Sequence, residues 1–457
     1  MAQDRYTLNY RAAEVQQVLE WVKSGQSGCL IGLRGAGKSN FLRFLLHQAV
    51  RQHYLGPDTA DFSFVHVDLL ALSEPAEWAV YELILNHLLN HLQRSGPAEH
   101  AQELGTLQLE VIQTRDILIA QRAFERGVEL IYHRPAQRLV FLFDEFGTIF
   151  GRLGPALFRH LRAVRDAHKD QLCYIVVVAN DLADLRNDLA EVEHFYRLVS
   201  RNVCGLGPYN EADTRQMIRF LAVQHAISLN EEAETVLTNL SGGHAGLLKD
   251  ILSLLRNVLP ENNEAVKPAR VLEKLTPSLL EAQVVQDECR KVWASLSQNE
   301  QAALPVLLAG QPVDPPTLQR LKRKGLVRQG ISEILFFSPV FANFVRQQRP
   351  SARQGVIISR SPRLVQLEGR QIKGLSSSEF ELLTYLYDHR DRICTKDELI
   401  QNIYPQEHHR TEGDMDDGRL QKLISRLRQK IGAGSEQPSY IVTVRGEGYR
   451  FVEPGET

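Results

Sequence analysis

The segment from Gly32 to Ser39 has residue types and a spacing that suit phosphate binding. Its sequence, GLRGAGKS, matches G-x-x-x-x-G-K-[ST]. In such a loop the glycines let backbone N–H groups face the phosphates, the lysine reaches the β and γ oxygens, and the hydroxyl ligates Mg²⁺. A helix that begins near Asn40 would point its positive end at the same anion. The sequence therefore predicts ATP and Mg²⁺ as ligands, held by Gly32, Gly35, Ala36, Gly37, Lys38, Ser39 and Asn40.

Polar residues end two further apolar runs. The run RLVFLFDE, Arg138–Glu145, closes with two acids. Asp144 is expected beside Mg²⁺, with Ser39 as the other protein ligand, and Glu145 is expected to orient or deprotonate the attacking water. Asn180 follows the apolar run Cys173–Ala179 and is placed to sense the γ-phosphate. The simpler interpretations are a tight turn at the glycines and solvated polar residues at the strand ends.

The end of the chain combines a basic helix with a hairpin. Gly418–Ile431 has apolar residues on one helical face, and Tyr440–Val452 consists of two strand-like runs around a glycine-containing turn. Between residues 419 and 450 there are seven Lys and Arg against two Glu. A basic helix suits the DNA major groove, and a hairpin arginine suits phosphate or the minor groove. The predicted contacts with double-stranded DNA are Arg419, Lys422, Ser425, Arg426, Gln429, Thr443, Arg445 and Arg450; the alternative is a solvated basic face.

Composition limits the classes of protein that fit. The chain has 457 residues, 43% of them hydrophobic and 24% charged, as in ordinary globular proteins. A net charge of −2 excludes a globally basic nucleic-acid binder, so a DNA-binding surface has to be local. The five cysteines have no metal-like spacing and are expected to be buried free thiols. The first residues lack an apolar signal core and no apolar run approaches about 18 residues, so a cytoplasmic protein without a membrane segment is expected.

The pattern of elements predicts an α/β fold: a three-layer P-loop ATPase domain with a helical lid, followed by two winged-helix domains. Apolar runs expected as buried parallel strands alternate with longer helical patterns, among them Asn40–Arg51 and Trp78–Leu92. The expected strands are Cys29–Leu33, Phe62–Leu70, Leu139–Phe143 and Cys173–Ala179. The expected boundaries are 1–208 for the ATPase core, 209–278 for the lid, 279–348 for a connecting winged helix, 349–355 for a linker and 356–457 for the DNA-binding domain.

Residues 8–350 resemble AAA+ and STAND-type P-loop ATPases, on the phosphate-loop and acidic motifs above. The resemblance implies that Arg11 lies near the nucleotide base and that Arg197 or Arg201 is an arginine finger presented to a neighbouring subunit. The segment GGHAGLLKDIL resembles the lid motif of these ATPases and implies His244 and Lys249 as nucleotide sensors, although Ala245 stands where the family has proline.

Residues 356–454 resemble the OmpR/PhoB-type winged-helix DNA-binding domain. The segments that carry the resemblance are LSSSEFELLTYL, TKDELIQNIY, LISRLRQKI and YIVTVRGEGYRF. It implies a recognition helix at about 417–431 and a wing at about 440–452. The loop PQEHHRTEGDMDDG is long and acidic here. In the family this loop often faces RNA polymerase, so the resemblance implies RNA polymerase as a partner.

These observations predict an ATP-dependent DNA-binding transcriptional regulator and probable slow ATPase, whose nucleotide state controls homo-oligomerisation and DNA engagement. An arginine finger links nucleotide to assembly, because it stabilises γ-phosphate charge only where a neighbour is present. The alternatives are an ATPase resembling origin-recognition proteins or helicase loaders, and a defence or transposition ATPase that assembles on DNA.

Overall fold

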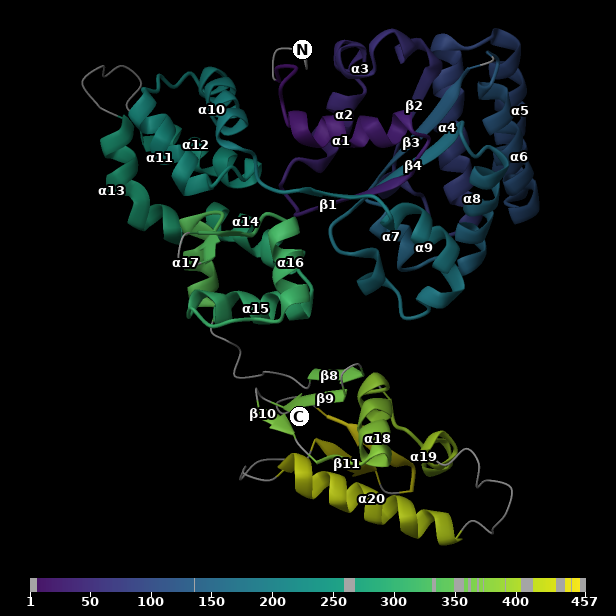
Figure 1. Cartoon of the computed structure of the whole chain (residues 1–457), viewed down its shortest axis with the longest axis vertical. Helices are drawn as coiled ribbons and strands as arrows, with labels where there is room; N and C mark the ends of the chain where they lie inside the picture. Colours follow the sequence, from purple (N-terminus) through teal and green to yellow (C-terminus); the bar gives the residue numbers. More distant parts are fainter. Residues whose placement is uncertain are drawn as a thin grey trace. The chain divides into compact units, whose positions relative to one another are not determined.

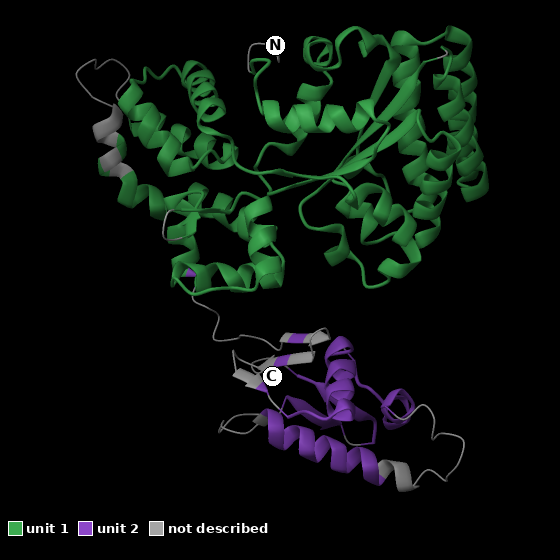
Figure 2. Cartoon of the chain, viewed as in Figure 1, with its two compact units in different colours: residues 1–347 green, residues 348–457 purple. Residues whose placement is uncertain are grey.

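The computed structural model describes the chain as two compact units, residues 1–347 and 348–457 (Figures 1 and 2). The described residues are 6–134, 136–258, 268–330, 334–348, 357–360, 363–367, 370–372, 374–390, 392–403, 414–432, 440–444 and 446–452. Each unit has a hydrophobic core of its own and is treated separately below. The linker expected at 349–355 lies outside the described residues.

A five-stranded parallel sheet organises the first unit. Its strand order is β2-β3-β4-β1-β5, so β2 and β5 form the edges. The strands are β1 (Gly28–Gly32), β2 (Phe62–Asp68), β3 (Arg138–Asp144), β4 (Leu172–Val178) and β5 (Val203–Leu206). The four strands listed in the sequence analysis are confirmed with end shifts of one or two residues. Because the strands are parallel, the phosphate loop after β1 and the acids at the end of β3 both lie at the carboxyl ends of the strands.

Helices cover both faces of this sheet and make two cores (Figure 1). One face packs against α1 (Ala12–Lys23), α2 (Lys38–Leu45) and α3 (Gln48–Leu55). The other packs against α4 (Glu77–Ser95), α5 (Ala98–Thr114), α6 (Ile117–Ile131), α7 (Gly147–Phe150), α8 (Pro155–Ala167) and α9 (Glu193–Ser200). Short 3-10 turns occur at Gly56–Asp61, Leu69–Ala71, Leu182–Leu185 and Leu189–Val192.

The single helix expected over Asn40–Arg51 is wrong: the structure has two helices, α2 and α3. His47 between them is extended (φ −68°, ψ 130°) and starts the second helix. No proline or glycine marks this break in the sequence. Packing accounts for it, because the turn lets Val50 and Leu55 of α3 reach the core that already contains Phe41 and Leu42 of α2.

The rest of unit 1 is helical, apart from one small hairpin. Asn210 and Asn230 cap the first two of these helices, each accepting a backbone N–H with its side chain. The helices are α10 (Glu211–Gln224), α11 (Glu231–Ser241), α12 (Ala245–Val258), α13 (Pro268–Glu281), α14 (Gln283–Ala294), α15 (Gln298–Leu308), α16 (Pro315–Arg323) and α17 (Pro339–Gln347). The antiparallel hairpin is β6 (Val327–Gln329) with β7 (Ile334–Phe336).

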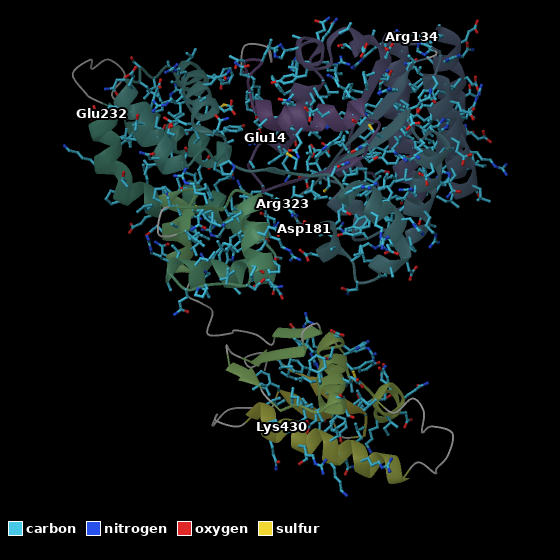
Figure 3. All side chains as sticks on the ribbon, in the orientation of Figure 1. Glu14, Arg134, Asp181, Glu232, Arg323 and Lys430 are labelled. Atoms are coloured by element: carbon cyan, nitrogen blue, oxygen red, sulfur yellow. The ribbon has the colours of Figure 1, made fainter. Side chains whose placement is uncertain are left out.

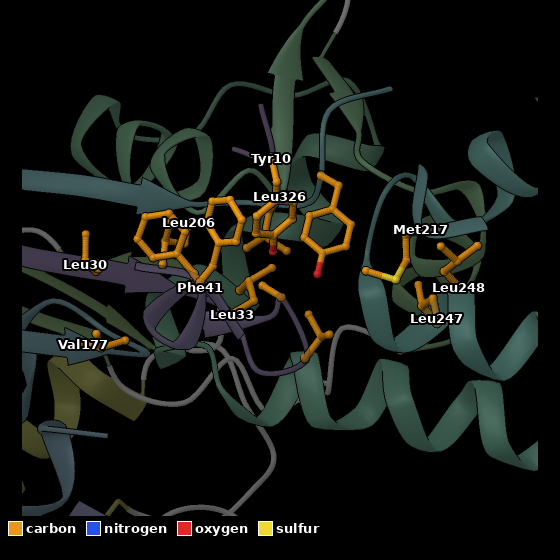
Figure 4. Packing of buried hydrophobic residues seen from close by; sticks show 14 of the residues in the cluster. Tyr10, Leu30, Leu33, Phe41, Val177, Leu206, Met217, Leu247, Leu248 and Leu326 are labelled. Atoms are coloured by element: carbon orange, nitrogen blue, oxygen red, sulfur yellow. The ribbon is translucent and has the colours of Figure 1, made fainter. Parts of the chain in front are cut away.

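These helices share a core with the sheet, which is why residues 1–347 form one unit. Figure 4 shows part of this cluster, which includes Tyr10, Leu206 and Leu326. The chain after α16 lies directly on β5: a Cβ on Gly205 would overlap the Arg323 carbonyl, and one on Gly207 would be 3.2 Å from the Gly325 Cα. The boundaries expected at residues 208 and 278 therefore fall inside one packed body and stay predictions.

The second unit contains three helices and five strands among its described residues. A capping box starts α18, in which Ser376 and Glu379 each bond the other's backbone N–H. The helices are α18 (Ser377–Asp388), α19 (Lys396–Ile403) and α20 (Asp414–Gly432). A three-stranded sheet holds β8 (Ile357–Arg360), β9 (Arg363–Leu367) and β10 (Arg370–Ile372), and the hairpin expected at the end of the chain is β11 (Ile441–Val444) with β12 (Gly448–Phe451).

Two compositional expectations can be compared with the structure. All five cysteines are free and buried, as expected. Among the described residues, no helix combines the length and apolar character needed to cross a membrane.

Candidate nucleotide site and DNA-binding surface

The phosphate loop lines a pocket of about 640 Å³ at the carboxyl ends of the strands. Seven of the residues predicted to hold the nucleotide or activate water line this pocket: Gly35, Gly37, Lys38, Ser39, Asn40, Glu145 and Lys249. Gly35 and Gly37 have φ of 77° and 86°, a left-handed conformation that glycine adopts without steric cost. The loop therefore turns sharply into α2, which begins at Lys38.

Lys38 is a buried cation at the base of this pocket. Its side chain is 5% exposed, and its Nζ donates a hydrogen bond to the Gly32 carbonyl at 3.1 Å. Glu145 Oε1 lies 3.6 Å away. Burial lowers the pKa of Lys38, and the carboxylates of Glu145 and Asp144 oppose that shift. The site thus holds an ammonium group whose main compensation is one carboxylate at long range, which suits a lysine that exchanges this contact for phosphate oxygens.

Asp144 ends β3 and is buried beneath the loop. Its carboxylate accepts the Glu145 N–H at 3.0 Å, and its Oδ2 lies 3.9 Å from His66 Nε2. Burial works to raise the pKa of Asp144, but the His66 imidazole, the Ser39 hydroxyl and the Glu145 amide together hold it below its ordinary value. An ionised carboxylate next to the Ser39 hydroxyl is a ligand pair that Mg²⁺ accepts.

Glu145 has an unusual backbone conformation. Its φ is 51°, which is rare and costly for a residue with a side chain. Such conformations cluster at functional sites, where the surrounding structure enforces them. Here the result is that Glu145 lines the pocket beside Lys38, whereas the preceding Asp144 points into the protein.

Arg11 lies behind the phosphate loop. It is 1% exposed, and one guanidinium nitrogen donates to the Ala36 carbonyl at 3.0 Å and to the Gly207 carbonyl at 2.6 Å. The guanidinium also stacks 4.8 Å from the Tyr209 ring centre. Arg11 therefore braces the loop against the segment that follows β5. The contact with a nucleotide base stays a prediction, and Arg11 is not among the residues lining the pocket.

His244 and Lys249 occupy different positions at the start of α12. Lys249 is exposed and lines the pocket. His244 is fully buried: its Nδ1 accepts the Leu247 N–H at 3.3 Å, so its Nε2–H donates to the Arg34 carbonyl at 3.0 Å. Burial lowers the pKa of His244, against the effect of the Glu288 carboxylate, and keeps the ring neutral. His244 thus ties α12 to the backbone of the phosphate loop, and its role as a sensor of bound nucleotide stays a prediction.

Asn180 contacts a lysine from a distant part of the chain. Lys324, at the end of α16, is 2% exposed, and its Nζ donates to Asn180 Oδ1 at 2.7 Å and to Glu300 Oε2 at 2.8 Å. Next to this pair, Arg323 forms an ion pair with Asp181 at 3.2 Å (Figure 3). The strand end predicted to sense γ-phosphate is therefore connected to α15 and α16. The sensing role itself stays a prediction.

Arg197 and Arg201 lie away from the nucleotide pocket of their own chain. Both are exposed and line a different cavity, of about 810 Å³, which also contains Ser24–Ser27 just before β1. That cavity is at the amino ends of the strands, whereas the phosphate loop is at their carboxyl ends. Arg197 forms an ion pair with Glu193 at 2.6 Å. Neither arginine lines the nucleotide pocket of its own chain, and the role of either one in trans stays a prediction.

The basic helix of unit 2 has the two faces expected from the sequence. Its apolar face packs into the core of the unit through Leu420, Leu423, Ile424, Leu427 and Ile431. The predicted DNA contacts that are described are all exposed: Arg419, Lys422, Ser425, Arg426, Gln429, Thr443 and Arg450. Arg445, the remaining predicted contact, lies outside the described residues.

A basic residue that was not predicted as a contact holds the hairpin to this helix. Arg428 donates to the Ile441 carbonyl through Nε (3.0 Å) and an NH2 nitrogen (2.7 Å), and to Thr443 Oγ1 at 2.8 Å. The other edge of the hairpin is fixed by paired backbone hydrogen bonds between Tyr449 and Cys394. Helix and hairpin therefore present their exposed basic residues from one rigid framework.

Sequence reasoning missed three residues that contact the nucleotide site. His66 had a local signal, because it is a polar residue in the otherwise apolar strand FSFVHVD. Glu288 and Lys324 had none. A Cβ on Gly35 of the phosphate loop would overlap Glu288, which shows that this carboxylate packs directly on the loop. Glu288 and Lys324 are more than 100 residues from the phosphate loop in the sequence, so their contacts with the site form only on folding.

We expect Lys324→Met to lower the free energy of unfolding by about 3–5 kcal/mol, because it leaves Glu300 buried without its cation. Lys322→Met is the matched control: Lys322 is exposed, two residues before Lys324, and its loss should change stability by less than about 0.5 kcal/mol. Urea denaturation of the full chain measures both. Equal stability of the two variants would contradict the structural role of the buried pair.

Comparisons with known proteins identify both units. Residues 2–328 match the family model described as "Novel STAND NTPase 1", and residues 369–451 match the model described as "Transcriptional regulatory protein, C terminal". The alkaline phosphatase synthesis transcriptional regulatory protein PhoP of Bacillus subtilis is 40% identical over 81 residues, which cover 18% of this chain and 31% of PhoP. The chain thus spans about a third of the length of the curated relatives it matches.

Two solved structures are similar to parts of the chain. The DNA-binding domain of Klebsiella pneumoniae RstA, in complex with the RstA box, is 32% identical; the match covers 21% of this chain and 91% of that one, with a TM-score of 0.18. A Walker-type ATPase of Pyrococcus abyssi is 14% identical; the match covers 74% of this chain and 95% of that one, with a TM-score of 0.47. The five-stranded parallel sheet with its phosphate loop and the C-terminal basic helix and hairpin agree with these matches. The chain belongs to the novel STAND NTPase 1 family, and its C-terminal part is an OmpR/PhoB-type winged-helix DNA-binding domain.

Proposed function

We propose that this protein is an ATP-dependent transcriptional regulator in which Mg²⁺-ATP controls self-association and DNA engagement. The observation that carries the proposal is the buried Lys38 ammonium between the phosphate loop and the Asp144–Glu145 acids, in a chain that also contains a DNA-binding domain. Ser39 and Asp144 would hold Mg²⁺, which supplies charge neutralisation at the phosphates. Glu145 would orient the attacking water from its place in the pocket.

Nucleotide control is supported by contacts from residues 279–348 to the nucleotide site. Glu288 of α14 packs on Gly35, and Lys324 of α16 bonds Asn180. Phosphate in the pocket would add negative charge beside the Glu288 carboxylate and repel it. We propose that this region, whose α14–α17 helices and β6–β7 hairpin suit a second winged helix, shifts when the γ-phosphate is present.

DNA reading is assigned to the exposed face of α20 and to the hairpin. Arg426 and Gln429 would contact base edges, and Arg450 would contact phosphate. The acidic loop that the family turns toward RNA polymerase falls largely on residues 404–413, outside the described part of the chain. A contact with RNA polymerase therefore stays a prediction.

Lys38→Ala should abolish ATP binding, because it removes the counter-charge of the β and γ phosphates. Glu145→Gln should keep binding but slow hydrolysis by about 10²–10⁴-fold, because only water activation is lost. Equilibrium binding of a fluorescent ATP analogue and phosphate release measure the two effects. Lys23→Ala, at an exposed lysine far from the pocket, is the control. Equal nucleotide affinity of Lys38→Ala and Lys23→Ala would refute the site.

Arg426→Ala should weaken specific DNA binding by about 1–3 kcal/mol, as expected for the loss of a base contact. Arg450→Ala should weaken binding to all sequences alike and reduce the salt dependence by about one ion, because it removes a phosphate contact. Fluorescence anisotropy over a salt series separates the two. Arg390→Ala, an exposed arginine that stacks on Tyr387 elsewhere in the unit, should change neither quantity. Unchanged affinity in both test variants would show that helix and hairpin do not touch DNA.

A non-hydrolysable ATP analogue should drive self-association of the wild-type chain, and ADP should not. The Arg197→Ala/Arg201→Ala double variant should stay monomeric, because a neighbour's γ-phosphate would lose its arginine. Assembly would then tighten binding to tandem DNA sites by raising the effective concentration of the reader. Analytical ultracentrifugation tests both chains. A wild type that remains monomeric with every nucleotide, with and without DNA, rules out this mechanism.

A further inference from the structure

A second polar cavity lies beside β2, on the outer edge of the sheet. Its volume is about 990 Å³, larger than that of the nucleotide pocket. The walls come from β2, from α3 and the turn after it, from α4, and from the segment before β3. In the sheet order β2 is an edge strand, so in the part of the chain that the structure describes no strand pairs with its outer side.

The cavity is lined by basic groups and by no carboxylate. Its charged or titratable lining residues are Arg51, Arg94, Arg134, His66, His87 and His91. Burial lowers the pKa of His91, and the nearby positive charges of Arg51, His133 and Arg94 lower it further. The three arginines therefore give the cavity a positive charge that no lining carboxylate offsets, and an anion bound among them would be stabilised.

Arg51 is the lining residue that most clearly lacks an anionic partner. Its Nε is buried without a hydrogen-bond partner, and within the described residues its guanidinium forms no ion pair. The guanidinium lies 5.5 Å from the Phe64 ring centre, which holds it at the cavity wall. Burial alone lowers the pKa of Arg51, and no carboxylate acts against it. Arg51 is half-buried, so its charge is partly removed from water without a counter-ion, and a bound anion would supply the missing partner.

The cavity fits a small ligand better than an added peptide strand. Phe62, Ser63, Phe64 and Val65 of β2 are each at most 6% exposed, so little of the strand's backbone is open to a partner. Gln137 closes one end by donating to Ser63 Oγ at 2.8 Å. Planar guanidinium groups with histidines around them are the usual donors for phosphate and carboxylate groups.

His66 connects this cavity to the nucleotide site. It lines the cavity, and its Nε2 is 3.9 Å from Asp144 Oδ2 and has no hydrogen-bond partner among the described residues. A ligand that contacts His66 changes the position of the ring next to the proposed Mg²⁺ ligand. Among the described residues that line the cavity, His66 alone forms an ion-pair contact with Asp144.

We propose that the cavity beside β2 is an effector site for a small polyanion bearing phosphate or carboxylate groups, and that His66 relays its occupancy to Asp144. The binding step stands on the cavity alone. The relay step rests on the proposed Mg²⁺-ATP site.

The binding step is tested by isothermal titration calorimetry of the full chain carrying Lys38→Ala, which removes the phosphate-loop site. Pyrophosphate and citrate serve as probes of the two anion chemistries. We expect one saturable site for at least one probe, weakened tenfold or more by adding Arg51→Met. Arg256→Met, an exposed arginine on α12, is the control and should leave the affinity unchanged.

The Arg94→Gln/Arg134→Gln double variant controls for misfolding of Arg51→Met, because both of its side chains are exposed. This pair should weaken binding several-fold with an unchanged circular dichroism spectrum. No saturable binding of either probe, or binding that is equal in the Arg51→Met and Arg256→Met chains, overturns the effector site. Binding of a hexaglutamate peptide without binding of either small anion overturns the ligand class in favour of strand addition to β2.

The relay is tested in the chain with an intact phosphate loop, at fixed free Mg²⁺, by measuring the affinity for a non-hydrolysable ATP analogue with and without the bound anion. A shift of several-fold that disappears in both Arg51→Met and His66→Gln supports it, since coupling between two sites acts equally in both directions. A shift retained in His66→Gln, or no shift, overturns the relay and leaves the binding result intact. A chain that fails to bind the analogue at all refutes the nucleotide site instead.

Discussion

Buried positive charge is the constraint on which unit 1 depends. Three of its described cations are at most 5% exposed: Lys38 in the phosphate loop, Arg11 behind that loop and Lys324 against the end of β4. Removing such groups from water costs several kcal/mol each unless partners compensate. Arg11 has two backbone carbonyls and Lys324 has a carboxylate and an amide oxygen, whereas Lys38 has one carbonyl and a carboxylate at 3.6 Å. The least compensated of the three faces the open pocket, as a phosphate ligand requires.

The partners of these cations come from distant segments, and this joins the sheet to the helices that follow it. Arg11 connects the segment before α1 with the phosphate loop and with the chain after β5. Lys324 connects the end of β4 with α15. Because the same core continues from β1 to α17, a change at one of these contacts alters packing at the others. The architecture thus connects the phosphate loop with residues 279–348 through direct contacts.

Unit 2 uses charged residues differently. Lys430 forms an ion pair with Glu379 at 2.6 Å and Arg428 bonds the hairpin backbone, so two of the basic residues on α20 hold the framework together. The remaining basic residues of its outer face are exposed. This division leaves Arg426 and Arg450 available for nucleic acid, while the geometry that presents them is fixed by their neighbours.

The sequence by itself determined the local chemistry and the order of elements. The motif from Gly32 to Ser39, the acids after the apolar run to Phe143 and the two faces of the Gly418–Ile431 helix are all contained in short segments, where spacing dictates which residues adjoin. The pattern of apolar residues located four of the five strands of the sheet to within two residues, because each of these is a continuous apolar run, and it did not include β5. It missed the break at His47, which no local residue signals.

Only the tertiary structure decided which distant residues share a site. It placed Lys324 on Asn180, Glu288 on Gly35 and His66 beside Asp144. It also placed Arg197 and Arg201 at the amino ends of the strands, away from the phosphate loop. It also separated Arg428, which holds the hairpin, from Arg426, which is exposed. These outcomes depend on contacts between residues far apart in the chain, whose cost and gain are set by burial, and the local sequence does not mark which single charged residue will be buried.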